Sequence, residues 1–463
     1  MAFDTPKSKR SARRLGVLLA VTLGAVLLAI AGRASTSQDA AMPRPQPTVM
    51  QPSPAAPDPV PHRLEVTTHP KGAAVTITMA DGSTQTGTTP FAGTLMGGDL
   101  QLQVSLGGYN RITRNIALDR DRSLDLWLDP KGLLHHKVGE LTTGSNPKQV
   151  AFSPDGRQLW VTLLGGKGVE VFDHQTLQRL AQIELGSHGA VEVIFDRDGS
   201  TAYASQMETA SVFEIDRATF AVRRQLSTKG VWSKVMALSP DERTLYVANW
   251  SSNNVSEIDL GTGMVRRLLA TVGTPRGLYP TPDGQRLFVA GFDRGQLARI
   301  DLASGRSQTL LDTGGALRHL VGDPNRGMLY ADDMAKNAAY ALDLRGEQPR
   351  KLAATGKKPN TIDLSPDGKV LYVSNRGENG RTFYAPGPEW GSVLAIDTAT
   401  GKALDAIVGG NQTTGLDVSP DGRLLAFSDF LDNRVQIFEI PPFQTLTNGG
   451  GGRATAHLAD IPK

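Results

Sequence analysis

The chain has 463 residues, more than one ordinary domain needs, and its 50 glycines and 28 prolines exclude a mostly helical architecture. The absence of cysteine excludes disulfides, thiolate metal ligands, a cysteine nucleophile and covalently attached haem c. The net charge of +3 comes from a basic N-terminus, since the first 33 residues hold six Lys or Arg and one Asp, so no nucleic-acid partner is expected.

The N-terminal segment predicts export. Residues 1–14 are basic and are followed by 18 uncharged residues, 15–32, which would span roughly 27 Å as a helix and match the hydrocarbon core of a bilayer. The positive-inside rule keeps residues 1–14 in the cytoplasm and places the rest across the membrane. Ala29-Ile30-Ala31 also fits a cleavage site, so the segment is either a retained transmembrane helix, which we favour, or a cleaved signal peptide.

Residues 33–62 predict a linker. Eight prolines between positions 43 and 61 remove backbone donors and favour extended polyproline-II geometry, so the stretch cannot form a sheet ladder. We expect it to act as a semi-rigid spacer.

From residue 63 onward, apolar and polar residues alternate as in half-buried strands, over 64–68, 75–79 and 100–106. Turn motifs separate these stretches. The segment 63–130 resembles the PEGA domain, a small β-sandwich common in bacterial surface and envelope proteins. The matching residues are Pro70, Gly72, Ala73, Val75, Gly87, Thr89, Pro90, Gly98, Gly108 and Tyr109. The resemblance implies a structural or adhesive spacer.

The rest of the chain is a repeat of about 42 residues. A turn resembling Ser153-Pro154-Asp155-Gly156 recurs at Asp155, Asp198, Asp241, Asp283, Asn325, Asp367 and Asp421. A second marker ends the third strand of each unit, at Asp173, Asp216, Asp259, Asp301, Asp343, Asp397 and Glu439. Units of this length with four short strands are typical of propeller blades. The sequence therefore predicts an all-β protein, with a seven-bladed β-propeller over 134–442 after a small β-sandwich and an N-terminal transmembrane helix.

The third unit contains Tyr246-Val247-Ala248-Asn249, and residues 371–375 repeat this core. The stretch 245–259 resembles the YVTN repeat of bacterial seven-bladed propellers. That family mixes lactonase-like enzymes with binding proteins, so the resemblance implies the fold and leaves the activity open. Together with the N-terminal helix it implies a single-pass protein of the bacterial inner membrane with periplasmic C-terminal domains.

The seventh unit lacks a fourth strand, because Pro441-Pro442 follow its third. Residues 137–141 resemble the fourth strand of the first unit, 180–185. We expect them to pair with the last blade and close the ring, which removes two exposed edges. Residues 443–463 are expected to form a flexible tail, with 443–447 as an alternative fourth strand.

The strand order places the loops between second and third strands and the connections between blades on one face, the upper face. Twelve extra residues of the sixth unit fall in such a loop, 376–391. Aromatic and arginine side chains there are typical of recognition surfaces, and the candidate binding residues are Arg376, Arg381, Phe383, Tyr384 and Trp390. A neutral insertion packed on the rim is the alternative. The expected partner is an envelope protein or a glycan.

The candidate catalytic residues are His188, His319, Asp332 and Asp333, which the strand order places near the upper face. Neutral imidazole and carboxylates could hold a divalent metal that activates water, as a lactonase-like hydrolase would need. The sequence has no tight ligand spacing, phosphate-binding glycine loop or G-x-S-x-G elbow, so no cofactor is expected and a metal is the alternative. We favour a membrane-tethered binding or scaffold protein over the hydrolase. A propeller that binds haem noncovalently comes third.

Overall fold

The computed structural model describes residues 60–378 and 380–456. The predicted membrane segment 15–32 and nearly all of the linker 33–62 lie outside the described residues. In the described part the regular elements are strands and one six-residue helix. Among the described residues, no helix has the length and hydropathy of a membrane span.

Residues 61–127 form a sandwich of two sheets, with strand orders β4-β1-β7 and β3-β2-β5-β6. Neighbouring strands are antiparallel, except that β1 and β7 are parallel. Alternate side chains of β1, such as Leu64 and Val66, are buried against Ile77, Leu102 and Val104. The strands are β1 (Pro61–His69), β2 (Ala74–Met79), β3 (Thr84–Thr88), β4 (Phe91–Met96), β5 (Gly98–Ser105), β6 (Ile112–Leu118) and β7 (Arg122–Trp127).

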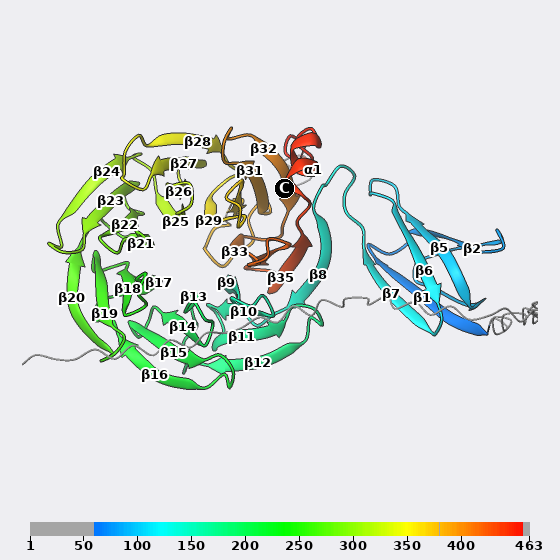
Figure 1. The fold of residues 1–463 in the computed structure, drawn as a ribbon, viewed down its shortest axis with the longest axis horizontal. Coiled ribbons are helices and arrows are strands. Elements are labelled where there is room, and N and C mark those ends of the chain that lie inside the picture. The colour runs from blue at the N-terminus through cyan, green and yellow to red at the C-terminus, as the bar shows by residue number, and fades with distance from the viewer. Residues whose placement is uncertain (1–59, 379, 457–463) are drawn as a thin grey trace, which may run out of the picture. The chain divides into compact units, whose positions relative to one another are not determined.

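Seven four-stranded sheets follow and surround an axis, as Figure 1 shows. Blades 1 to 3 are β9 (Pro147–Phe152), β10 (Gln158–Leu163), β11 (Gly168–Asp173), β12 (Arg179–Glu184); β13 (Val193–Phe195), β14 (Thr201–Gln206), β15 (Ser211–Asp216), β16 (Val222–Ser227); and β17 (Ser233–Leu238), β18 (Thr244–Asn249), β19 (Asn254–Asp259), β20 (Met264–Ala270). Blades 4 to 6 are β21 (Pro275–Pro280), β22 (Arg286–Gly291), β23 (Gln296–Asp301), β24 (Ser307–Asp312); β25 (Leu317–Asp323), β26 (Met328–Asp333), β27 (Ala338–Asp343), β28 (Arg350–Ala354); and β29 (Pro359–Leu364), β30 (Val370–Asn375), β31 (Ser392–Asp397), β32 (Ala403–Val408). The all-β, seven-bladed prediction is confirmed, and every third strand ends at its predicted marker.

The repeated aspartates hold the turns between first and second strands. Asp155 Oδ1 accepts hydrogen bonds from the Ser153 hydroxyl at 2.6 Å and the Arg157 N–H at 3.1 Å. Such a side chain replaces a backbone acceptor inside the turn. In the fifth blade, where the sequence has Asn325, Asp323 accepts from the Arg326 N–H instead.

Blade 7 closes the ring with strands from both ends of the propeller. It consists of β33 (Thr413–Val418), β34 (Leu424–Asp429), β35 (Arg434–Glu439) and β8 (His136–Thr142). Strand β8 pairs antiparallel with β35, with Leu141 opposite Val435. The buried Leu141 packs in one apolar cluster with Val435 and Ile437. The predicted closure by residues 137–141 is confirmed.

The segment after Pro442 corrects the prediction of a flexible tail from residue 443. Residues Phe443–Asn448 form helix α1 and no fourth strand. Leu446 is 1% exposed and packs in the core shared by blades 6 and 7, which an isolated sequence pattern does not show. Further on, the Arg453 N–H donates to Asp405 Oδ1 at 2.9 Å, and Asp405 Oδ2 binds the buried His135 ring at 2.8 Å.

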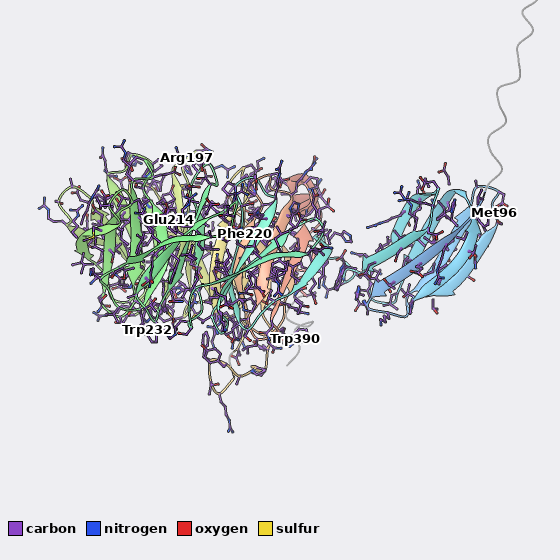
Figure 2. The ribbon with its side chains drawn as sticks, turned by 90° about the horizontal axis from the view of Figure 1, so that it is seen from below. Met96, Arg197, Glu214, Phe220, Trp232 and Trp390 are labelled. Atoms are coloured by element: carbon purple, nitrogen blue, oxygen red, sulfur yellow. The ribbon has the colours of Figure 1, made fainter. Side chains whose placement is uncertain are left out.

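The two faces of the propeller carry different connections. Figure 2 shows Trp232 and Trp390 on one side of the ring and Arg197 on the opposite side. Trp232 belongs to a connection between blades and Trp390 to the 376–391 loop, whereas Arg197 lies in a turn between first and second strands. The upper face is therefore the side of Trp232 and Trp390.

Candidate functional site

Cations gather where the first strands begin, at the upper end of the axis. Lys148, Lys234, Arg276 and Arg318 are each the second residue of a first strand, in blades 1, 3, 4 and 5. Counted back from the turn marker, blades 2, 6 and 7 have Val191, Asn360 and Thr414 at the equivalent position, and Val191 lies just before β13. The buried Arg376 joins the four from the loop of blade 6. These five residues are called the axial cations below.

The axial cations face one another across the ring. Burial lowers the pKa of Lys148 well below its usual value, and Arg318, Arg276, Arg376 and Lys234 lower it further. Burial, with Arg276 and Arg318, lowers the pKa of Lys234 to about 6. Arg318 of blade 5 can lower the pKa of Lys148 of blade 1 only if both side chains extend to the axis of the ring.

Several polar atoms of this cluster are buried and have no hydrogen-bond partner in the described structure. They are Lys148 Nζ, Arg276 Nε, Arg376 Nε, Asp332 Oδ2 and Asn360 Oδ1. Arg318 differs, because its Nε donates to the Asn360 carbonyl at 3.0 Å. Buried polar atoms are nearly always paired in folded proteins, so a group of unpaired ones at one place indicates a binding site.

Two acids and a histidine lie beside the axial cations. His319 Nδ1 is 3.1 Å from the Ile362 carbonyl and so donates to it, and His319 Nε2 lies 4.0 Å from Glu192 Oε1. Burial lowers the pKa of His319 to about 3, so the ring is neutral. Burial also raises the pKa of Glu192 to about 7 and that of Asp332 to about 6. Both acids therefore titrate close to neutral pH.

An aromatic wall stands next to the cations, at the residue that follows the second strand. Trp250, Phe292 and Phe430 occupy this position in blades 3, 4 and 7. Lys234 Nζ lies 3.6 Å from the centre of the Trp250 ring, and Lys148 Nζ lies 5.9 Å from that of Phe430. These contacts hold the two lysine side chains against the ring faces and bring no negative charge beside them.

The 376–391 loop of blade 6 packs against Phe430 of this wall. Arg376 donates to Gln412 Oε1, and Gln412 Nε2 donates to the Phe383 carbonyl at 2.8 Å. The Phe383 ring packs edge-on against Phe430, with centroids 5.2 Å apart. At the base of the loop, Lys357 Nζ binds Glu378 and Glu389 at 3.1 and 2.9 Å. The loop is thus fixed at both ends beside the axis.

The predicted binding residues separate into two groups. Arg376, Phe383 and Tyr384 come together around Phe430, although Arg376 is buried. Tyr384 remains 58% exposed and Phe383 37% exposed. Arg381 is exposed, and Trp390 is half-buried where the loop returns to β31.

The predicted catalytic residues are also divided. His319 lies at the axis, and its N–H donates to Asp332 Oδ1 at 2.6 Å. His188 is exposed elsewhere on a blade connection. Asp333 is buried and accepts from the N–H groups of Ala316, Ala335 and Lys336, so it organises its loops. Over residues 60–378 and 380–456, no three His, Asp or Glu side chains are grouped to hold a metal ion.

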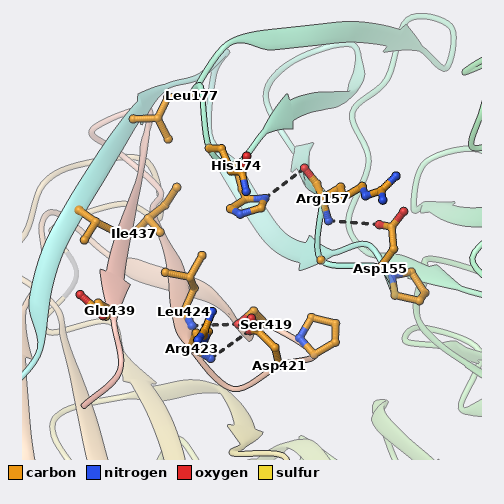
Figure 3. Close-up of a pocket in the computed structure, with 15 residues that line it drawn as sticks. Asp155, Arg157, His174, Leu177, Ser419, Asp421, Arg423, Leu424, Ile437 and Glu439 are labelled. Carbon is orange, nitrogen blue, oxygen red and sulfur yellow. Dashed lines mark hydrogen bonds between the residues drawn. The ribbon is translucent and has the colours of Figure 1, made fainter. Parts of the chain in front are cut away.

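A groove of about 1070 Å³ lies between blades 7 and 1, and Figure 3 shows its lining. Several of its polar groups are already paired within the turns that line it. The His174 ring contacts the Arg157 carbonyl at 3.2 Å, and Asp421 Oδ1 accepts from the Arg423 N–H at 3.1 Å. Because these groups serve their own turns, the groove offers less chemistry than the axis.

Sequence reasoning missed the axial cations other than Arg376, and Glu192. The signal is present in the repeat. Seven residues before each turn marker, the units have Lys148, Val191, Lys234, Arg276, Arg318, Asn360 and Thr414. Lys or Arg occupies this position in four of the seven units, which indicates that these side chains point in a common direction.

Comparisons with known proteins agree with this architecture. The family model described as "Lactonase, 7-bladed beta-propeller" matches residues 117–279 and 278–448, and the PEGA domain model matches residues 62–131. Antigen Lp49 of Leptospira interrogans is 34% identical over 354 residues, which cover 73% of this chain and 77% of the relative.

Among solved structures, the hydrazine synthase of Kuenenia stuttgartiensis is similar, with a TM-score of 0.55. The match covers 65% of this chain and 97% of the solved chain, at 20% identity. At that identity the likeness concerns the fold alone.

Proposed function

Because the chain belongs to the seven-bladed lactonase-type β-propeller family and carries a PEGA domain, we propose that it is a binding protein of the bacterial cell envelope. Its ligand binds at the upper end of the axis, between the aromatic wall and the 376–391 loop. The N-terminal segment tethers the chain to the inner membrane, and the linker and sandwich act as spacers on the periplasmic side.

The contact of Phe383 with Phe430 carries this proposal. It places the insertion loop beside the axis, next to the unpaired polar atoms of the axial cations. Phe383 and Tyr384 pack on Phe430 and still expose much of their rings. Exposed aromatic rings beside fixed polar donors suit a sugar, whose ring has apolar faces and hydroxyl edges. We therefore favour a glycan as the ligand.

Deletion of residues 378–389 tests the proposal, because it shortens the loop by the twelve extra residues and keeps Arg376 and Trp390. Immobilised polysaccharides of bacterial envelopes serve as probes for the purified full chain. We expect the deletion to abolish glycan binding and to leave the unfolding transition in place, since the loop lies outside the sheet ladders.

The exposed Arg243, in a turn on the lower face, provides the control, and Arg243→Gln should bind like the unchanged chain. Equal glycan binding with and without residues 378–389 would contradict the proposal. If no glycan binds and a photoreactive group at position 384 cross-links to an envelope protein, the partner is a protein and the glycan is wrong.

A lactonase-like hydrolase is the second candidate, and Glu192 is the observation that favours it. A carboxylate whose pKa lies near 7 is suited to act as a general base, and it faces the neutral His319. Hydrolysis of simple lactones by the purified chain, lost in Glu192→Gln and retained in Arg243→Gln, would establish this activity in place of binding alone.

A further inference from the structure

We propose that the axial cations form an oxyanion site, so that the ligand carries a carboxylate or phosphate group that enters the ring between Lys148, Arg276 and Arg318. This inference rests on the proposed function, because it names the chemical class of the ligand that binds there.

The charge balance supports an anionic ligand. Five basic side chains converge on the axis, where Glu208 lies near Lys234 and Asp417 lines the cavity further along, and the buried acids beside the cluster are Glu192 and Asp332. Neither acid makes an ion pair with an axial cation in the described structure, where Glu192 lies near His319 and Asp332 accepts from a backbone N–H. Burial lowers the pKa of all five basic groups, repulsion by the other cations lowers it further in all but Arg276, and a bound anion would favour their charged forms.

The donors are built into the sheets. Lys148, Arg276 and Arg318 stand on first strands at the register shift against the second strand, so each lacks a ladder partner of its own while residues on both sides of it are paired. Such irregularities redirect a side chain away from the sheet. Lys148 Nζ and Arg276 Nε are buried and have no partner among the described residues, so they are available to a ligand. Arginine and lysine on rigid elements are the usual donors to carboxylates and phosphates.

The arrangement is not explained by folding alone. Blades 2, 6 and 7 close around the same axis with Val191, Asn360 and Thr414 at the equivalent position. A propeller of this kind therefore does not need a cation there. A cavity of about 280 Å³ lies further along the first strands and is lined in part by Gln149, Glu192 and His319, but by none of the axial cations.

Calorimetric titration of the purified full chain tests the inference with three probes, which are inorganic phosphate, D-glucuronate and neutral D-glucose. We expect at least one oxyanion to bind at least tenfold more tightly than glucose. We expect Arg276→Met and Lys148→Met each to weaken that binding at least tenfold, and Arg243→Met, with the same change of net charge on the lower face, to leave it unchanged.

A thermal melt of each variant shows whether a loss of binding comes from a loss of folding. Removing an unpaired buried cation should not lower the melting temperature, and the oxyanion that binds should raise it in the unchanged chain but not in Arg276→Met. Binding of glucuronate alone assigns a carboxylate, and binding of phosphate alone assigns a phosphate. The inference is wrong if neither oxyanion binds, or if both bind Arg276→Met as tightly as the unchanged chain.

The deletion of residues 378–389 separates this inference from the proposed function. It retains Lys148, Arg276 and Arg318, so the oxyanion should still bind while the glycan is lost. Loop-dependent glycan binding without oxyanion binding would overturn the inference alone. Oxyanion binding with glycan binding that ignores the loop would overturn the proposed function alone.

Discussion

Glu192 shows how burial at the axis changes the pKa of a single side chain. Its Oε2 accepts the Met236 N–H at 2.7 Å, and burial nevertheless raises its pKa to about 7 from an ordinary value of 4.5. The folded state therefore prefers the protonated carboxyl. By linkage, this group stabilises the fold fully below pH 4.5, and that stabilisation is lost as the pH rises through about 7.

The sign of this linkage gives a prediction. Glu192→Gln stays neutral at every pH, so its free energy of unfolding should fall less between pH 5 and pH 8 than that of the unchanged chain, by about 1–3 kcal/mol. Urea unfolding at the two pH values measures the difference. The exposed Glu184→Gln should follow the unchanged chain, and parallel profiles for Glu192→Gln would contradict the assigned pKa.

Individual site residues were harder to predict than the turns. Asp155 and its counterparts act within four residues of chain, so local chemistry defines their role. Lys148 acts through partners in blades 3 to 6, more than 80 residues away in sequence, and no local pattern contains them. Arg376 was predicted as a binding residue, but its burial depends on Gln412 of the next blade connection.

At the scale of elements, arginines on outer strands connect neighbouring blades. Arg267 on β20 donates from Nε to Glu257 Oε2 at 2.6 Å. Its Nη2 donates to the Leu302 carbonyl of blade 4. Arg224 of blade 2 makes the same pair of bonds, to Glu214 and to the Leu260 carbonyl. One planar guanidinium thus serves two sheets from separate nitrogens held in a fixed fork, a geometry that the single ammonium of lysine does not provide.

We expect Arg267→Met to lower the free energy of unfolding by about 1 kcal/mol, because the side chain is partly exposed and water screens the ion pair. Arg267→Lys should not restore the loss. Arg266→Met is the matched control, since Arg266 bonds to Asp259 of its own blade, and its effect should be smaller. Chemical denaturation ranks the three variants.

Strand β8 and helix α1, at the two ends of the propeller sequence, contribute unequally to its stability. Deletion of β8, residues 136–142, leaves β35 with an unpaired edge and should abolish cooperative unfolding or cause aggregation. Truncation after Pro442 removes α1 and the buried Leu446 but no ladder, so the transition should persist at a lower midpoint. Calorimetry distinguishes the two, and equal losses would mean that α1 is as necessary for closure as β8.

At the scale of the whole molecule, the sequence predicted the architecture through its repeat. The turn and strand-end markers recur in phase in all seven units, and the missing fourth strand after Glu439 indicated closure by 137–141. Helix α1 escaped prediction, because Phe443 and Leu446 form no long periodic pattern and are covered only by the assembled blades 6 and 7.

Topology gives a prediction for the complete chain. We expect a reporter fused after Lys463 to be active only on the periplasmic side, and the chain to remain in the membrane fraction, because basic residues precede the uncharged run 15–32. Cell fractionation with a protease-protection assay measures both. Release of a soluble chain that lacks its first thirty-odd residues would indicate a cleaved signal instead.

The pairing of β8 with β35 also sets an order for folding during synthesis. His136 must find Glu439, about 300 residues later in the chain. At roughly 5–20 residues per second, the ribosome takes on the order of 15–60 s to supply that partner. Throughout this interval the growing propeller is an open arc of completed blades with β8 unpaired. Blade 7 is therefore the last blade to be completed, and a truncated chain would present the unpaired edge of β8 to other strands.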